Sequence, residues 1–114
     1  MLQPELFGAL ADPTRLRLVE ALRGGERAVN DLVAQVDLHQ SGVSRHLRVL
    51  HQAGLVQMRP SGPHRLYSLR PERFLELEAW LGSYRRLWEA RLDRLGQALE
   101  GKQRARRPRH GGSA

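Results

Sequence analysis

The sequence predicts a mainly α-helical domain with one small β-hairpin, and three observations support this prediction. Apolar residues recur every three or four positions through much of the 114-residue chain, which is the period of a helix. Residues 55–58 and 65–69 are strand-like instead, and Pro60, Gly62 and Pro63 between them are typical of a turn. After residue 71 the helical period returns and continues to residue 99.

The first two helices are predicted within the first 25 residues. Apolar residues at helical spacing between positions 2 and 10 indicate a short first helix. Asp12 followed by Pro13 is a helix-start signal, because aspartate can accept hydrogen bonds from the free amides of the first turn and proline is tolerated there. We expect the second helix to turn Leu16, Val19 and Leu22 inward and to end at the glycine pair 24–25.

Two helices joined by a tight break follow. Apolar residues at 29, 32, 33 and 36 indicate a third helix over 29–36, and residues 37–39 form the break. The fourth helix runs from about 40 to 53, with Val43, Leu47 and Leu50 on its inward face and Gly54 as its end. The second helix of such a pair is narrow enough to enter the major groove of DNA.

The last helix carries an apolar stripe that is too long for a domain of this size. At 1.5 Å per residue, a helix over 72–99 is about 42 Å long, and a small core cannot cover both of its ends. We therefore predict a folded domain over 1–100, whose last helix a partner covers in part, and a basic disordered tail over 101–114. The stripe consists of Phe74, Leu77, Leu81, Tyr84, Trp88, Leu92, Leu95 and Leu99.

Basic charge is concentrated in two blocks. The chain has 19 Lys and Arg against 12 Asp and Glu, for a net charge of +7. Residues 38–71 contain five Arg and no acidic residue, and residues 101–114 contain five further Lys and Arg. A basic block inside the folded region indicates a polyanionic partner. Together with four short helices, a hairpin and a long helix, this pattern predicts a winged helix-turn-helix that binds double-stranded DNA.

The outward face of the helix over 40–53 carries side chains that can read base edges. Arginine can grip guanine O6 and N7, glutamine can pair with adenine N6 and N7, and serine can bond to bases or phosphates. We therefore expect base contacts from Gln40, Ser41, Ser44 and Arg45. We expect phosphate or minor-groove contacts from His46, Arg48, Arg59, His64 and Arg65.

Several motifs together resemble one known family. Residues 11–18 read ADPTRLRL, residues 40–50 read QSGVSRHLRVL and residues 53–56 read AGLV. The hairpin ending YSL at 67–69 and the segment from Trp88 to Leu95 fit the same pattern. Over roughly residues 4–99 the chain resembles the ArsR/SmtB family of winged-helix transcriptional repressors. The resemblance implies a DNA-binding regulator, and we expect a repressor that occludes a promoter.

The resemblance also implies a homodimer in which the first and last helices pack across a two-fold axis. Two recognition helices related in this way would bind an inverted repeat, with half-sites about one helical turn apart or a small multiple of that. The expected interface residues are Leu6, Phe7, Leu10, Leu77, Leu81, Tyr84, Trp88, Leu92 and Leu95.

The metal-sensing residues that this family uses do not occur at the matching positions. Its thiolate sensors carry cysteines where this chain has Ala28 and Asn30, and the chain contains no cysteine. Another family site uses histidines on the last helix, but no histidine lies between His64 and His110. No two histidines stand at the i, i+4 spacing of a ligand pair on a helix. We expect no metal and no cofactor.

An enzyme or a membrane protein fits the sequence poorly. Ser44, Arg45 and His46 are consecutive, and consecutive residues on a helix point about 100° apart, so they cannot form a catalytic relay. We therefore expect no catalytic residues. No apolar run approaches the roughly 18 residues needed to cross a bilayer, and no signal peptide is visible. We expect a cytoplasmic protein.

One alternative function stays open, namely a winged helix that coats DNA without sequence preference or that binds RNA or protein. The basic tail favours a coating protein, because its charges add affinity without reading bases. The Gln, Ser and Arg face of the fourth helix favours sequence-specific binding. The inducing signal is also open, since a small molecule at the dimer interface, a partner protein or the protein concentration alone would each fit.

Overall fold

The computed structural model describes residues 2–106 and, for residues 104–106, only the course of the helix. The chain divides into two compact units between Glu78 and Ala79. The first unit contains every short helix and the sheet, and the second consists of the greater part of the last helix.

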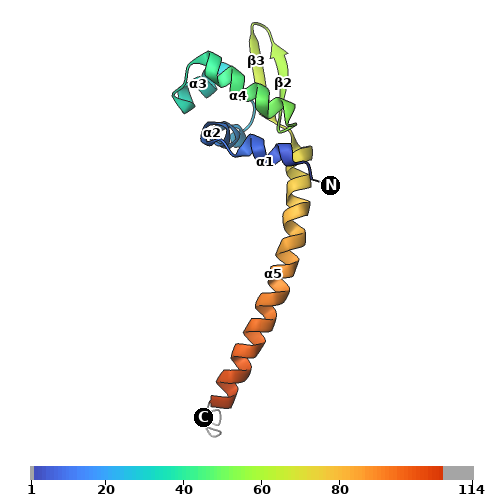
Figure 1. Ribbon diagram of the computed structural model, residues 1–114. Coiled ribbons are helices and arrows are strands. Elements are labelled where there is room, and N and C mark those ends of the chain that lie inside the picture. Colours follow the sequence, from blue (N-terminus) through green and yellow to red (C-terminus); the bar gives the residue numbers. More distant parts are fainter. Residues whose placement is uncertain (1, 107–114) are drawn as a thin grey trace. The chain divides into compact units, whose positions relative to one another are not determined.

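The order of elements in Figure 1 confirms the predicted fold class, a mainly helical winged helix-turn-helix with a small antiparallel sheet. The helix-turn-helix is formed by α3 and α4, and the hairpin that follows it by β2 and β3. The elements are α1 (Pro4–Leu10), α2 (Pro13–Ala21), the 3-10 helix η1 (Leu22–Gly24), β1 (Arg27–Ala28), α3 (Val29–Val36), α4 (Gln40–Gln52), β2 (Val56–Ser61), β3 (His64–Leu69) and α5 (Pro71–Arg106).

The start of α2 confirms the signal seen in the sequence. The Asp12 carboxylate accepts hydrogen bonds from the amides of Thr14 at 2.8 Å and Arg15 at 3.0 Å. These bonds satisfy two of the amides that have no partner inside the helix. Pro13 occupies the first helical position, where its missing N–H costs nothing.

The end of α4 depends on a glycine. Gly54 has a φ of 76°, in the left-handed region that favours glycine. A Cβ atom at this position would also lie 2.8 Å from Nε of Arg73. The chain reverses here, and the amide of Leu55 donates to the carbonyl of Leu50 at 3.0 Å. Gly54 thus directs the chain from α4 into the hairpin.

The sheet has three antiparallel strands in the order β1-β3-β2, so β3 lies in the centre. The hairpin register pairs Met58 with Tyr67 and Arg59 with Leu66. The two-residue strand β1 lies on the other side of β3, where Ala28 pairs with Leu66. The sequence analysis missed β1, because two residues are too short to display the alternation that marks a strand.

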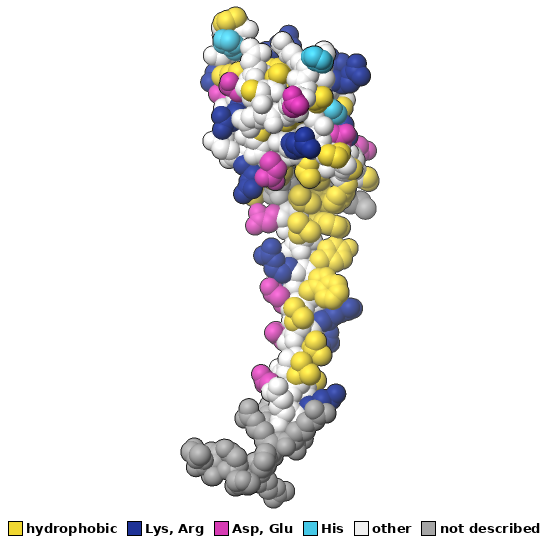
Figure 2. Space-filling view, turned by 90° about the vertical axis from the view of Figure 1, so that its left-hand side faces the viewer, with side chains coloured by type: hydrophobic (Ala, Val, Ile, Leu, Met, Phe, Trp, Pro, Cys, Tyr) yellow, Lys and Arg dark blue, Asp and Glu magenta, His cyan; other side chains and the backbone are white. Residues whose placement is uncertain are grey.

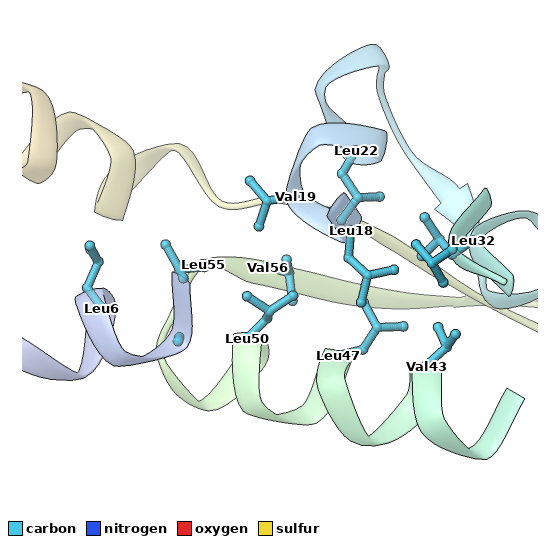
Figure 3. Close-up of a cluster of buried hydrophobic side chains, with 12 residues drawn as sticks. Leu6, Leu18, Val19, Leu22, Leu32, Val43, Leu47, Leu50, Leu55 and Val56 are labelled. Carbon is cyan, nitrogen blue, oxygen red and sulfur yellow. The ribbon is translucent and has the colours of Figure 1, made fainter. Parts of the chain in front are cut away.

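The hydrophobic core of the first unit lies between α1, α2, α3, α4 and the hairpin, as the side chains in Figure 3 show. Val43, Leu47 and Leu50 of α4 are fully buried, as predicted. The inward face of α2 was predicted incorrectly, because Leu16 is 46% exposed and Leu18 is buried in its place. Val19 and Leu22 can be buried together with either Leu16 or Leu18, so only the packing of α2 against the core decides which of these two leucines is buried.

The last helix, α5, continues to Arg106, past the expected end at residue 99. The remainder of the predicted basic tail, 107–114, lies outside the described residues. In the second unit, one side of the helix carries the apolar stripe (Figure 2). The large apolar side chains of this unit are between 38% and 61% exposed. They are six members of the stripe, Leu81, Tyr84, Trp88, Leu92, Leu95 and Leu99, and also Trp80 and Leu87.

Candidate nucleic-acid interface

The position of α4 is determined by its buried side. Three fully buried side chains, Val43, Leu47 and Leu50, attach it to the core along its length. The helix begins after His39, which has the extended backbone of a helix cap but makes no side-chain capping bond. This agrees with the absence of a serine or threonine at the position. The opposite side of α4 is therefore held rigidly toward solvent.

Side chains without acidic neighbours cover that outward side. Gln40, Ser41, Arg45 and Arg48 are exposed, and Ser44 is half-buried on the flank that faces the hairpin. No Asp or Glu occurs anywhere between residues 38 and 71. Among the described ion pairs, none involves an arginine of α4. These cationic groups are therefore available for a polyanion.

The hairpin and α4 meet around two small polar hollows. One, of about 150 Å³, is lined by Ser44, Arg48, His51, Met58, Arg65 and Tyr67. The other, of about 170 Å³, shares three of these residues and adds Gln40, Pro63 and His64, together with residues 28–30 at the junction of β1 and α3. The structure thus brings together five of the predicted contact residues, namely Gln40, Ser44, Arg48, His64 and Arg65.

Sequence analysis missed two residues of this surface, His51 and Tyr67. His51 lies two helical turns after Ser44 and therefore on the same flank of α4. Tyr67 follows Arg65 by two residues in β3 and therefore shares its face of the sheet. Both periodicities were visible in the sequence, but only the contact between helix and hairpin shows that the two flanks face each other.

Arg59 lies apart from the other predicted hairpin residues. Directly opposed residues of an antiparallel pair share a face, so Pro60 and Arg65 lie on one face and Arg59 and Leu66 on the other. Arg59 donates from Nε and Nη2 to the two carboxylate oxygens of Glu26, both at 2.8 Å. These hydrogen bonds and the charge of Glu26 raise the pKa of Arg59 above its ordinary value.

His46 also lies away from this surface, on the other flank of α4. It is half-buried, and its Nδ1 lies 3.4 Å from Nη1 of Arg15 in α2. Arg15 in turn donates to the carbonyl oxygens of Ala9 at 2.7 Å and Gly8 at 3.2 Å, at the end of α1. Since a guanidinium group can only donate, this contact is a hydrogen bond when Nδ1 is unprotonated. His46 therefore connects α4 to α1 and α2.

The residues expected at a dimer interface differ in their exposure. Leu6 is 2% exposed and belongs to the core of the first unit, so it has little surface to offer a partner. Leu10 and Leu77 are partly buried against that core, whereas Phe7 is 43% exposed. The remaining five are between 47% and 61% exposed along the second unit, namely Leu81, Tyr84, Trp88, Leu92 and Leu95.

Residues 2–106 contain neither a cluster of metal-binding side chains nor a membrane-spanning helix. No group of three or more histidine, aspartate or glutamate side chains is placed to hold a metal ion within that range. In the same part of the chain, no helix has the length and apolar character needed to cross a membrane.

Comparison with known proteins gives a consistent result. Residues 12–58, from the cap of α2 into the hairpin, match the model of the bacterial regulatory proteins of the arsR family. The HTH-type transcriptional regulator Rv2034 of Mycobacterium tuberculosis is 38% identical over 92 residues, which cover 81% of this chain and 83% of that protein. The chain belongs to the ArsR family. It is thus a sequence-specific DNA-binding transcriptional regulator rather than an enzyme.

Other ArsR-family proteins support this assignment. The transcriptional repressor SmtB homolog of Synechocystis sp. is 44% identical over 73 residues, which cover 64% of this chain and 55% of that protein. The chain therefore spans about half the length of that relative. A solution structure of the homodimeric winged helix-turn-helix DNA-binding domain of Mb0332 from Mycobacterium bovis matches with a TM-score of 0.60 and 29% identity, covering 70% of this chain and 74% of that one. ArsR-family proteins typically bind DNA as homodimers.

Proposed function

We propose that this ArsR-family regulator is a homodimeric repressor that binds an inverted-repeat operator and occludes a promoter. The observation that carries the proposal is the surface formed by α4 and the hairpin. Arg45, Arg48 and Arg65 belong to this surface, and the segment that forms it, residues 38–71, contains no Asp or Glu. On an ordinary solvated helix face, acidic residues alternate with the basic ones. Such an acid-free surface suits the phosphate backbone of DNA.

Base contacts in this proposal come from the outward side of α4. Gln40, Ser41 and Ser44 occupy the first turns of the helix, and in helix-turn-helix proteins the beginning of the recognition helix reaches the base edges. Arg45 is exposed and follows directly, with a side chain long enough to reach guanine O6 and N7. These four residues would determine which operator is chosen.

Phosphate contacts come from the two sides of the hollow between α4 and the hairpin. Arg48 on the helix and Arg65 on the hairpin both line the hollow of about 150 Å³, together with His51. A DNA phosphate placed between them would receive hydrogen bonds from both elements. His64 lines the neighbouring hollow near the hairpin tip and would contact the adjacent backbone or the minor groove.

Dimerisation would cover the apolar stripe of α5. Leu92 and Trp88 are 61% and 58% exposed, and a contiguous stripe of such side chains marks an association surface. Phe7 and Leu10 of α1 would extend the interface, in line with the homodimer known for the Mycobacterium bovis domain. A two-fold axis relating two copies of α4 requires an operator with the same symmetry. We expect this assembly to act in the cytoplasm.

The test is selection of bound sites from a random duplex library by the purified protein at about 150 mM salt. We expect an inverted repeat whose half-sites lie about one helical turn apart, or a small multiple of that. Tight, salt-sensitive binding without a consensus would instead favour the DNA-coating alternative, since phosphate contacts alone carry no sequence information. Absence of binding to any duplex would contradict both.

The inducing signal is a separate question. The chain has no cysteine, so a thiolate metal sensor of the kind found in this family has no ligands in this chain. A small-molecule effector, a partner protein and the protein concentration itself remain the candidates. If a small molecule or a partner protein is the signal, adding cell extract to the complex of protein and operator should release the DNA.

A further inference from the structure

The ion pair between Glu26 and Arg59 differs from the other described ion pairs. The other three join residues two or three positions apart, namely Glu20–Arg23, Arg70–Glu72 and Arg73–Glu76. Glu26 and Arg59 are 33 residues apart, and both carboxylate oxygens accept a bond from the guanidinium group at 2.8 Å. Such bidentate geometry orients both side chains, which a single contact between flexible groups does not.

The pair bridges the whole width of the sheet. Arg59 lies in the edge strand β2, and Glu26 lies directly before the opposite edge strand β1. The central strand β3 lies between them, and its Leu66 is paired with both Arg59 and Ala28. The ion pair therefore joins the two edges of the sheet across the central strand, on the face opposite to Arg65.

The segment that holds Glu26 is continuous with the helix-turn-helix. Ala28 ends β1 and is also the residue that precedes the first turn of α3. The backbone connection between β1 and the hairpin is only two residue pairs long, Arg27 with Tyr67 and Ala28 with Leu66. Packing of Val56, Tyr67 and Leu69 against the core holds the base of the hairpin, and the bond from β2 to Glu26 adds a constraint at Arg59, nearer the hairpin tip.

We propose that Glu26 and Arg59 form a clamp that orients the hairpin relative to α4, and that Arg59 acts as a positioning residue for DNA binding. Glu26 takes two of the N–H donors of Arg59 and offsets its positive charge, so a phosphate that approaches Arg59 also meets the carboxylate, which repels it. Arg65, on the other face, remains available for the phosphate.

The clamp affects orientation more than stability. The side chains of Arg59 and Glu26 are 61% and 31% exposed, and exposed ion pairs contribute little to the free energy of folding. A small change in the hairpin angle, however, moves Arg65 away from Arg48 on the far side of the hollow. The loss should therefore appear in the affinity for DNA while the thermal unfolding midpoint changes little.

The first experiment measures the hairpin in the free, full-length protein, so it does not depend on the proposed operator. Backbone ¹⁵N relaxation of residues 57–68 is compared for the wild type, Arg59→Gln and Glu26→Gln. If the clamp exists, each variant raises the mobility of the hairpin, and the exchange variant Glu26→Arg with Arg59→Glu restores it. Unchanged relaxation in both single variants would overturn the clamp.

The second experiment measures affinity for the selected operator and its dependence on salt, and it rests on the proposed function. Arg59→Gln and Glu26→Gln should each weaken binding by a similar factor, roughly threefold to tenfold, and the double variant should be no worse than either. The slope of affinity against salt should not change, and the exchange variant should regain affinity. The control Arg65→Gln should instead reduce that slope by about one.

The opposite pattern would identify Arg59 as a phosphate contact and overturn the proposal. In that case Arg59→Gln would weaken binding to every duplex and reduce the salt slope, whereas Glu26→Gln would leave binding unchanged or strengthen it. If the wild type binds no duplex while the relaxation experiment succeeds, the clamp stands and the proposed function fails.

Discussion

The two units of this chain differ in whether their apolar side chains are buried or exposed. In the first unit twelve apolar residues are buried against one another, and Leu18, Leu32, Leu47 and Leu50 have no exposed area. In the second unit the described part is a single helix, whose Trp88, Leu92 and Leu95 are all more than half exposed. The first unit therefore has a hydrophobic core of its own, whereas the second unit has an exposed apolar surface that a partner would have to cover.

This difference predicts what each unit needs in order to be stable. Packing between the four short helices α1 to α4 and the hairpin stabilises the first unit within one chain. An isolated helix, by contrast, is marginal in water, because most helical stability in proteins comes from packing of an apolar face. We therefore expect the second unit to be stable only when a partner covers its stripe, and its stability to depend on protein concentration.

The largest expected effect comes from breaking the first unit at its centre. Leu47→Ala should lower the free energy of unfolding by about 2–5 kcal/mol, because Leu47 is fully buried and its removal leaves a cavity. Urea unfolding at a fixed protein concentration measures this. Leu16→Ala is the matched control, since Leu16 is 46% exposed, and its effect should be several times smaller. Equal losses would mean that Leu16 contributes to the core as much as Leu47 does.

A charge in the stripe tests the second unit. Leu92→Glu should raise the dissociation constant of the dimer roughly tenfold or more, because it places a carboxylate in an apolar interface. Sedimentation equilibrium measures the constant, and the unfolding of the first unit should change little. Ala90→Glu introduces the same charge on the opposite side of the helix and serves as control. If both variants dissociate equally, the stripe is not the interface.

The predicted base contact of Arg45 tests the role of the first unit in DNA recognition. Arg45→Ala should weaken binding to the selected operator by roughly 1–3 kcal/mol and spare non-specific DNA. Fluorescence anisotropy with both duplexes measures the ratio. The control Arg17→Ala removes the same charge from an exposed position on α2. Equal losses on both duplexes would make Arg45 a phosphate contact.

The smallest effect concerns the cap that begins α2. Hydrogen bonds from the amides of Arg15 and Thr14 lower the pKa of Asp12, so its folded pKa lies below its unfolded one. The cap therefore stabilises the first unit above the ordinary carboxyl range, and this contribution is lost as the pH falls through the lowered folded pKa. The difference in melting temperature between the wild type and Asp12→Asn should shrink progressively as the pH falls from about 5 toward about 2.

A second variant in the first unit, Asp31→Asn, distinguishes this cap from a general effect of charge. Asp31→Asn removes a carboxylate from the first turn of α3 that makes no hydrogen bond among the described contacts. Its melting temperature should follow that of the wild type over the same pH range. A parallel change in both variants would show that net charge, and not the cap, causes the dependence.

Features that arise from neighbouring residues could be predicted from the sequence. The cap by Asp12, the end of α4 at Gly54 and the span of α3 were each expected at their observed positions. The acid-free stretch from 38 to 71 could be read directly, and its side chains Gln40, Ser41, Arg45 and Arg48 are exposed on α4. These signals are local, since they depend on contacts within a few residues of the chain.

Contacts between distant parts of the chain were decided only by the tertiary structure. The sequence predicts DNA contacts for both Arg59 and His46 and gives no sign of their partners within the chain. Arg59 is bound to Glu26, 33 residues away, and His46 lies beside Arg15, 31 residues away. Periodicity assigns a residue to a side of its own helix or strand but does not say which other element lies there. That choice depends on the packing of the whole core, which is why the residues that orient this surface emerged only from the fold.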